Sequence, residues 1–298
     1  MKIPLVHLII LVLLTMPPAA RAWDDAGHLL VAQIAYSRLS PAKQSKLDAL
    51  CKTVSEIKHP SYNAVTAACY ADDQKRANHR QFRTWHYVDI ELEDGDASKA
   101  KSPNVVTAIQ TCRDVFQGKA KLVNGKNVDG TPHPMTQGEA IASLMHYVGD
   151  IHQPLHAADH HDTGGNNVAV TNLASLYPEL HSYWDSAFQR TLDAKGQVRV
   201  TLNVSRPATL PNATIAAKAS DLEAKYKPGP LWRTADPAIW AKESHKLAVK
   251  FAYDKLPGGR DAKSVTLDKT YTDAGCKLAG KRVVLAGYRL AALLDQLL

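Results

Sequence analysis

Apolar residues recur at helical spacing along most of the chain. Leu29, Leu30, Ile34 and Ala35 share one stripe, and Ser40-Pro41 then has the form of a helix N-cap followed by proline at the first helical position. The pattern predicts helices over residues 28–39, 41–51, 64–70, 104–116, 137–152, 173–192, 216–226, 237–256 and 283–298. A mainly α fold is therefore expected.

Strand signals are few. Asn124-Gly125, and the turn Asp162-Thr-Gly-Gly-Asn166 followed by Val168-Ala-Val170, predict one or two short β-hairpins. The proline-rich interval 206–237 is interrupted by helix-forming stretches, so we interpret it as a loop wrapped over the surface and not as a domain linker. These features predict one multi-helix domain.

The first 22 residues have the form of a secretory signal. Lys2 is followed by an apolar run over residues 3–16, by two prolines and by the small-residue site Ala20-Arg21-Ala22. Cleavage after Ala22 would remove residues 1–22 and leave a domain of residues 23–298 that begins at Trp23. The apolar run is shorter than the ~20 residues that span a bilayer, so a retained anchor is disfavoured. We expect a secreted or periplasmic protein with no membrane anchor after processing.

Composition adds modest constraints. A hydrophobic content of 45% is ample for a buried core, and a formal net charge of +7 suits a polyanionic substrate without proving one. No run of basic residues marks a nucleic-acid-binding arm. The four cysteines predict one or two disulfides in an oxidising compartment, with the pairing left open.

The richest segment chemically is residues 146–156, which holds three histidines and a carboxylate. His146 and Asp150 are four apart on a predicted helix, so both side chains leave the same face. Pro154 should end the helix and direct His156 elsewhere, so one helix end could supply two neighbouring metal positions. A single histidine on such a helix is often an ordinary core residue, but the pair His181 and Asp185 repeats the same spacing.

Other candidate ligands are weaker when taken alone. A new N-terminus at Trp23 could chelate a metal through its amine and carbonyl oxygen, with His28 nearby. The alternative is that Trp23 is a buried aromatic residue and His28 an ordinary helix-start residue. Asp72 and His86 are equally well explained, in isolation, as a solvated carboxylate and a hydrogen-bonded histidine.

Together these residues resemble the trinuclear-zinc, single-strand-specific nucleases and 3′-nucleotidases of the S1/P1 type, which have the phospholipase C/nuclease fold. The resemblance spans essentially the whole processed chain, and residues 240–244 and 286–291 also resemble later segments of that family. The main matching segments are Trp23-(x)4-His28, Ala71-Asp72, Trp85-His86-Tyr-Val-Asp89, His146-(x)3-Asp150-Ile-His-Gln-Pro-Leu-His156, Asp162-x-Gly-Gly-Asn166 and Leu180-His181-(x)2-Trp184-Asp185.

The resemblance implies a complete set of ligands for three Zn²⁺ ions. One ion would be held by Asp72, His86 and His146, and a second by His28 with the amine and carbonyl of Trp23. Asp150 would bridge these two ions. The third ion would be held by His156, His181 and Asp185. Manganese or cobalt could replace zinc, because nitrogen and carboxylate ligands do not fix the metal.

The activity implied is hydrolysis of single-stranded DNA and RNA to 5′-phosphorylated products, with removal of the 3′-phosphate from nucleotides. Zinc lowers the pKa of bound water from about 15.7 towards 7, and a metal pair can stabilise the attacking and leaving oxygens. Asp150 would thus be catalytic through the bridged pair, with a zinc-activated water as the nucleophile. A monomer is expected.

The resemblance also bears on residues around the metal ligands. In the family an acidic residue at Asp89 helps to orient the attacking group, and the alternative is that Asp89 only caps local backbone. Relatives usually carry arginine where Lys75 stands, so either Lys75 or Arg76 would neutralise the phosphate. Possible walls of a base-stacking pocket are Tyr70, Tyr87 and Tyr183, with none preferred. His152 is expected to brace the turn by a hydrogen bond, and His160 and His161 to be solvated.

Two other functions compete with this interpretation. A secreted trinuclear-zinc phospholipase C shares the fold and the N-terminal tryptophan but typically has glutamate where this chain has Asp185. A non-catalytic extracytoplasmic zinc-binding protein would explain the histidines, but it needs neither a bridging Asp150 nor a ligand made by signal cleavage. Digestion of both DNA and RNA would reject both alternatives.

Overall fold

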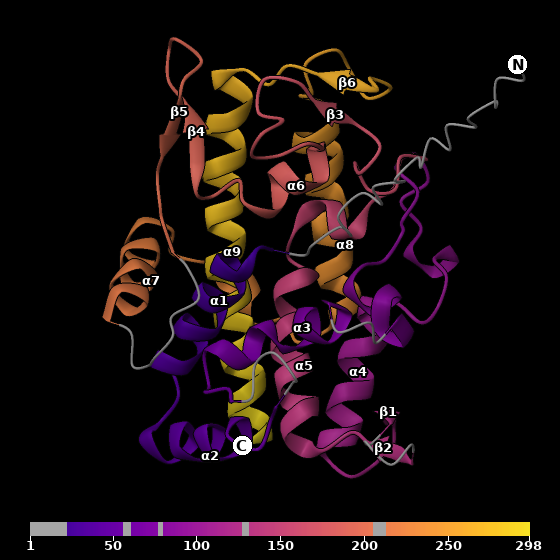
Figure 1. Ribbon diagram of the computed structural model, residues 1–298, viewed down its shortest axis with the longest axis vertical. Helices are drawn as coiled ribbons and strands as arrows, with labels where there is room; N and C mark the ends of the chain where they lie inside the picture. Colours follow the sequence, from indigo (N-terminus) through magenta and orange to yellow (C-terminus); the bar gives the residue numbers. More distant parts are fainter. Residues whose placement is uncertain (1–22, 56–60, 77–79, 127–130, 205–212) are drawn as a thin grey trace, which may run out of the picture.

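The computed structural model describes residues 23–55, 61–76, 80–126, 131–204 and 213–298 (Figure 1). The predicted signal peptide, residues 1–22, lies outside this part of the chain. As predicted, the fold is mainly helical with short strands, in one domain. The α-helices are α1 (Asp25–Ser37), α2 (Pro41–Cys51), α3 (Tyr70–Arg76), α4 (Val105–Phe116), α5 (Gln137–Asp150), α6 (Leu180–Asp185), α7 (Ala213–Lys225), α8 (Pro237–Leu247) and α9 (Lys269–Leu297).

Short 3₁₀ and π segments extend or connect these helices. Three of them carry or flank candidate ligands: η1 (Thr66–Cys69), which leads into α3, η2 (Arg80–His86), and η4 (Pro154–Ala157). The helix predicted over residues 237–256 is α8 continued by a π-helical segment, η6 (Ala248–Tyr253). The others are η3 (Ala97–Lys99) and η5 (Pro230–Arg233).

The strands form three two-stranded sheets. A hairpin forms near the predicted place, as the antiparallel pair β1 (Val123–Lys126) and β2 (Pro132–Pro134), but Asn124 and Gly125 lie within β1 and are not its turn. The second predicted hairpin is wrong, because β3 (Ala169–Val170) pairs in parallel with the distant β6 (Ser264–Val265). A hairpin that was not predicted joins β4 (Arg190–Leu192) to β5 (Val198–Val200).

The helix predicted over residues 173–192 is also wrong, since only α6 and the strand β4 form in the region. Pro178 lacks an amide hydrogen and disfavours helical backbone at the residue before it. Helical structure therefore starts only at Leu180, where the side chains of Glu179 and Ser182 cap the helix reciprocally.

Helix α9 begins earlier than predicted and runs most of the length of the molecule (Figure 1). The shorter helix α1 packs against part of it. Asp268 caps its first turn by accepting a hydrogen bond from the Tyr271 amide at 2.7 Å. Gly287 lets α1 approach closely, because a Cβ at this position would lie 2.5 Å from Cγ2 of Ile34. The first half of α9 is mostly polar, so the pattern of apolar residues predicted only the second half of the helix.

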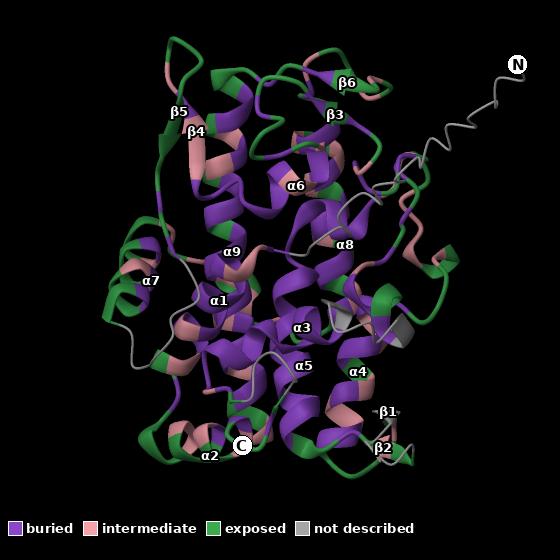
Figure 2. Cartoon of the chain, in the orientation of Figure 1, coloured by how far each residue is buried: buried purple, intermediate pink, exposed green. Residues whose placement is uncertain are grey.

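Helix α5 lies at the centre of the fold. Every residue from Gly138 to Asp150 is buried (Figure 2), and α1, α2, α3, α4 and α9 all pack against this helix. Its first turn has a capping box in which the side chains of Thr136 and Glu139 bond each other's backbone amides. The C-terminal end of α5 is therefore held in the interior, surrounded by the elements that carry the candidate ligands.

The predicted disulfides are absent. None of the four cysteines forms a disulfide: Cys51, Cys69 and Cys112 are buried, and Cys276 is partly exposed. Among the described residues, the structure contains no helix with the length and apolar character needed to span a membrane.

Candidate metal centre

His146 and Asp150 on α5 form the centre of the first group of candidate ligands. Their i, i+4 spacing places Nε2 of His146 3.2 Å from Oδ2 of Asp150, and both side chains are fully buried. From α1, His28 brings its Nε2 to 3.3 Å from the other carboxylate oxygen, Oδ1 of Asp150. The rings of His28 and His146 stack with their centroids 3.8 Å apart.

Asp72 of α3 and His86 at the end of η2 complete the surroundings of this carboxylate. Nδ1 of His86 lies 3.0 Å from Oδ2 of Asp150 and 3.8 Å from Oδ1 of Asp72. Nε2 of His146 lies 3.8 Å from the same Asp72 oxygen. Two overlapping groups that could hold a metal ion result, one of His28, His146 and Asp150 and the other of Asp72, His86 and His146.

The remaining group forms beyond the end of α5. As predicted, the helix ends before Pro154, and His156 is carried by the short helix η4. Nε2 of His156 lies 3.7 Å from Oδ1 of Asp185, and Nε2 of His181 lies 3.6 Å from the same oxygen. His181 and Asp185 are again four apart on one helix, α6. The structure thus gathers all eight predicted side-chain ligands into three buried groups.

Backbone carbonyls orient three of the imidazoles. Nδ1 of His146 donates to the carbonyl of Ala68 at 2.7 Å, Nδ1 of His156 to that of His86 at 2.6 Å, and Nδ1 of His181 to that of Gly164 at 2.7 Å. In each neutral ring the proton is therefore on Nδ1, and Nε2 presents a lone pair. This is the arrangement by which an outer hydrogen bond fixes the tautomer of a metal-binding histidine.

Two of these lone pairs point at one another, because the Nε2 atoms of His156 and His181 are 3.1 Å apart with Asp185 beside them. Two imidazole lone pairs at this distance repel unless a cation lies between them. Nε2 of His146 lies 3.1 Å from Nδ1 of His86, where the two nitrogens can share either a proton or a cation. The donor sets therefore fit metal ions.

Burial and charge shift the pKa values of these groups strongly. Burial alone would raise the pKa of Asp150, but His146 and His86 beside it outweigh burial and hold the pKa well below its ordinary value. Burial raises the pKa of Asp185 well above its ordinary value, and burial with the adjacent His146 lowers the pKa of His28. A bound cation would favour the ionised forms of Asp150 and Asp185 and the neutral form of His28.

Several polar atoms in these groups make no hydrogen bond within the described chain. They are both ring nitrogens of His28, Oδ1 of Asp150 and Oδ2 of Asp185, all of them buried. Buried polar atoms without hydrogen bonds are rare and costly, and ligation of a metal is one arrangement that satisfies them. Their positions, together with the converging histidines, support metal binding by these residues.

Trp23 lies against the same helix end. Its indole Nε1 donates to the carbonyl of Gly149 at 2.8 Å, and its ring packs edge-on against Phe188. The next residue, Asp24, accepts a hydrogen bond from Ser186 Oγ at 2.7 Å. Trp23 is fully buried, and its ring and the ring of His28 both lie against Gly149, the residue before Asp150.

Of the remaining candidate residues, the structure describes the side chain of Asp89 but not those of Lys75 and Arg76. Asp89 lies at an exposed position in a cavity of about 190 Å³ that is also lined by Glu91, Lys101 and Asp159. Partial burial and the neighbouring Asp159 and Glu91 raise the pKa of Asp89 to about 6. Lys75 and Arg76 are on α3, but their side chains lie outside the part of the chain that the structure describes.

Of the three tyrosines considered as base-stacking walls, two are excluded. Tyr70 and Tyr183 are buried in the core, where Tyr70 donates to Glu139 at 2.9 Å, so neither ring is available to a base. Tyr87 is half-buried and keeps part of its ring accessible. His161 is exposed as expected, but His160 is only partly exposed and lies between Glu93 and Asp261.

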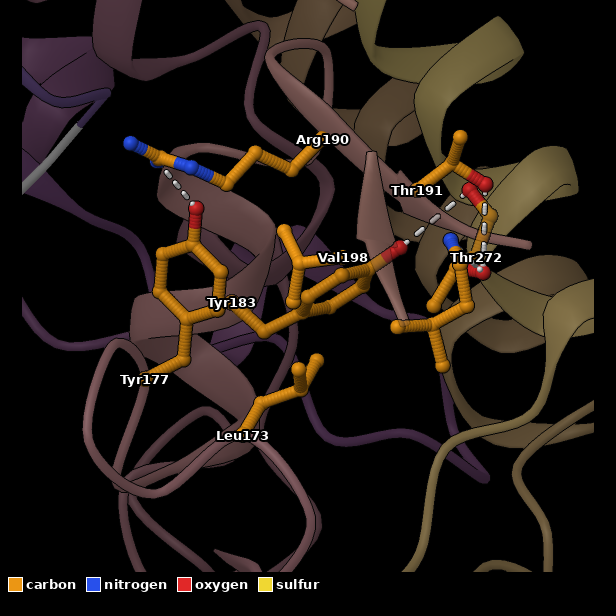
Figure 3. A pocket seen from close by; sticks show the side chains of 8 residues that line it. Leu173, Tyr177, Tyr183, Arg190, Thr191, Val198 and Thr272 are labelled. Carbon is orange, nitrogen blue, oxygen red and sulfur yellow. Dashed lines mark hydrogen bonds between the residues drawn. The ribbon is translucent and has the colours of Figure 1, made fainter. Parts of the chain in front are cut away.

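A small pocket near α6 is not part of the metal centre (Figure 3). Arg190 donates to the hydroxyl of Tyr177 at 2.7 Å on one side, and Thr272 accepts from Thr191 and Tyr183 on the other. Its volume of about 10 Å³ holds no more than one water molecule, so it offers no room for a nucleotide.

The partners that hold the candidate ligands in place give no local signal in the sequence. Gln153 donates to Asp185 at 2.7 Å, which ties the end of α5 to α6. The expected hydrogen bond of His152 is present, from Nδ1 to the carbonyl of Val148 at 2.7 Å. Arg289 donates to the other ring nitrogen of His152 at 2.9 Å, and this contact could have been suspected only from the family resemblance of residues 286–291.

Comparison with known proteins agrees with this geometry. The sequence model of the S1/P1 nuclease family matches residues 23–298. Endonuclease 4 and Endonuclease 3 of Arabidopsis thaliana are 28% and 29% identical to the chain, in each case over 97% of this chain and 93% of the relative. Nuclease S1 of Aspergillus oryzae is 25% identical over 92% of this chain and 91% of its own.

Proposed function

The chain belongs to the S1/P1 nuclease family and is therefore a hydrolase of phosphodiester bonds. From this premise we propose that it cuts single-stranded DNA and RNA to 5′-phosphorylated products and also removes the 3′-phosphate of nucleotides. The observation that carries the proposal is the convergence of eight buried histidine and aspartate side chains in three groups. Three Zn²⁺ ions are the proposed cofactors, since nitrogen and carboxylate ligands without thiolates suit catalytic zinc.

The two oxygens of Asp150 support a bridging role. Oδ1 faces His28, whereas Oδ2 faces His86 and His146. We assign Asp72, His86 and His146 to one ion, and His28 with the amine and carbonyl of Trp23 to the second. Each imidazole nitrogen can bind only one ion, so Asp150 is the side chain suited to join the two. His156, His181 and Asp185 would hold the third ion.

When bound, zinc would lower the pKa of a water molecule and neutralise phosphate charge. The residues of this chain supply orientation and charge around that chemistry. Asp150 fixes the spacing of the first two groups, and Asp89, ionised above a pKa of about 6, can orient the attacking group. Lys75 or Arg76 is proposed to neutralise the phosphate.

Processing and location belong to the same proposal. Removal of residues 1–22 would create the amine at Trp23, so export and assembly of the metal centre would be coupled. We propose a secreted or periplasmic monomer with no membrane anchor after processing.

The two alternative functions receive less support. The match to the S1/P1 nuclease family over residues 23–298 favours a nuclease over a phospholipase C, and Asp185 stands where phospholipases typically have glutamate. A non-catalytic zinc-binding protein would not need the full ligand set of a nuclease.

The proposal is tested by elemental analysis and hydrolysis assays on protein that begins at Trp23. We expect about three zinc ions per chain, cleavage of single-stranded DNA and RNA, release of phosphate from 3′-AMP, and loss of all three activities on chelation with recovery when zinc is returned. Chelation should also lower the melting temperature, because zinc binds only the folded state. Zinc binding with hydrolysis of phosphatidylcholine but not of nucleic acid would contradict the proposal.

A further inference from the structure

A buried network of charged side chains lies behind the turn that joins the metal groups. The turn, residues 151–153, connects Asp150 at the end of α5 to η4, which carries His156. Arg289 of α9 is only 1% exposed, so its guanidinium lies in the core. Its two terminal nitrogens donate to Oε2 and Oε1 of Glu243 on α8 at 2.7 and 2.8 Å, which is the two-pronged geometry of a strong ion pair.

The network ends on the turn itself. Nη1 of Arg289 also donates to Nε2 of His152 at 2.9 Å, and the opposite ring nitrogen of His152 donates to α5 at Val148. Arg282 of α9 donates from Nε to the carbonyl of His152 at 3.0 Å. The imidazole and the carbonyl of this one turn residue are thus both held by arginines of α9.

Helix α8 completes the restraint through Ser244. Its hydroxyl donates to the carbonyl of Ile151 at 2.5 Å and accepts from Nη2 of Arg282 at 2.7 Å. Two consecutive carbonyls of the turn are therefore occupied by side chains from α8 and α9, which are distant in sequence but packed at the same place.

Such a network is costly to bury and is weak evidence for stability, because well-packed apolar residues often replace buried ion pairs without loss. Its hydrogen bonds instead converge on the few residues that separate Asp150 from His156. These two residues belong to different metal groups. We propose that Arg289 is a positioning residue that, through His152, fixes the turn 151–153. It would thereby set the geometry between the two metal positions joined by Asp150, called the paired positions below, and the third position at His156, His181 and Asp185. The inference rests on the proposed function, since it concerns the same metal centre.

The test uses enzyme that begins at Trp23 and carries Arg289→Met, which keeps the apolar stem and removes the guanidinium. Zinc release to the chromogenic chelator 4-(2-pyridylazo)resorcinol is followed below the melting temperature, and kcat and KM are measured on single-stranded DNA. We expect release at least about tenfold faster and a lower kcat with KM nearly unchanged. Loss of a direct partner of a metal ligand costs roughly 10- to 100-fold in metal affinity, and the low end is expected because Arg289 acts one step further out, through His152. Arg289→Lys should recover part of the loss, since lysine keeps the charge but not the fork.

The matched control is Leu294→Ala, which removes a buried apolar side chain and so creates a cavity on the same helix, outside the network. This variant should lose stability and retain the zinc-release rate of the unaltered enzyme. If Arg289→Met releases zinc no faster than Leu294→Ala, the positioning role is wrong. If Arg289→Met does not fold, Glu243→Gln is measured in its place, and wild-type release from that variant likewise overturns the proposal. Because zinc release is measured without substrate, a protein that binds zinc but cuts no nucleic acid would contradict the proposed function and leave this test intact.

Discussion

The two candidate metal groups that share His146, called the paired groups, are built differently from the third group, which consists of His156, His181 and Asp185. The ligands of the paired groups come from α1, α3, η2 and the centrally buried α5, and the side chains of His146 and Asp150 are fully buried. The third group is carried by the short helices η4 and α6, and the side chain of His181 is 6% exposed. One part of the centre is anchored by the core, whereas the other depends on short segments.

The loop before α6 shows this dependence. His161, Thr163, Gly164 and Gly165 all have positive φ values, from 53° to 85°, and the carbonyl of Gly164 accepts the hydrogen bond that orients His181. Left-handed backbone is costly for residues other than glycine. The third group is therefore positioned by local backbone conformation, and the paired groups by the packing of long helices. Perturbations of the two parts should have separable effects.

The largest effect is expected from Asp150→Ala. Asp150 contacts all three histidines of the paired groups, so its loss should remove both paired ions and lower activity by at least about 10³-fold. Elemental analysis should find the third ion retained, whereas Asp185→Ala should lose only the third. Retention of three ions in Asp150→Ala would mean that Asp150 does not bridge the pair.

A smaller effect is expected when two residues, Gly-Ser, are left before Trp23. The indole of Trp23 can keep its hydrogen bond to Gly149, but the α-amine becomes an amide and can no longer bind a cation. One ion should be lost from the pair, as measured by zinc per chain. The control carries the same two residues after Leu298, and equal zinc content in the two proteins would exclude the terminal amine as a ligand.

Gly164→Ala should weaken the third group alone. A Cβ at this position would lie 3.0 Å from the carbonyl oxygen of Leu155, at a φ of +61°, so the carbonyl that holds His181 must shift. We expect the affinity for the third zinc to fall by about tenfold. Gly118→Ala is the matched control, because Gly118 has a φ of +72° but nothing within 4 Å of an added Cβ. Identical zinc titrations for the two variants would show that this loop does not position His181.

The smallest effect is a pH dependence at Asp89. Its pKa in the folded protein is raised from 3.8 to about 6, so the folded state binds the proton more tightly than the unfolded state. The free energy of unfolding should therefore fall as the pH rises from 3.8 to about 6, and Asp89→Asn should remove this part of the fall. Melting curves of chelated protein are the measurement, because a nearby cation would lower the pKa. Asp221→Asn, at an exposed site on α7, is the control, and a pH profile of Asp89→Asn that matches it in shape would count against the assignment.

Local sequence signals predicted much of the helical framework. The start of α2 at Pro41, the position of α4 within residues 104–116 and the end of α5 before Pro154 were all predicted, since prolines and helical periodicity act over a few residues. The strand pairing of β3 with β6 was not, because the two strands are far apart in sequence. The early start of α9 at Lys269 was missed for a related reason, since its first half is stabilised by packing and not by an apolar stripe.

The sequence by itself determined the donor types and the i, i+4 pairs, because side-chain chemistry and helical spacing are local properties. Only the tertiary structure decided that His28 faces one oxygen of Asp150 while His86 and His146 face the other. It also decided that Tyr70 and Tyr183 are buried, that the cysteines form no disulfide, and that Arg289 bonds to His152. These outcomes depend on how distant segments pack against α5, which local patterns of apolar and polar residues do not encode.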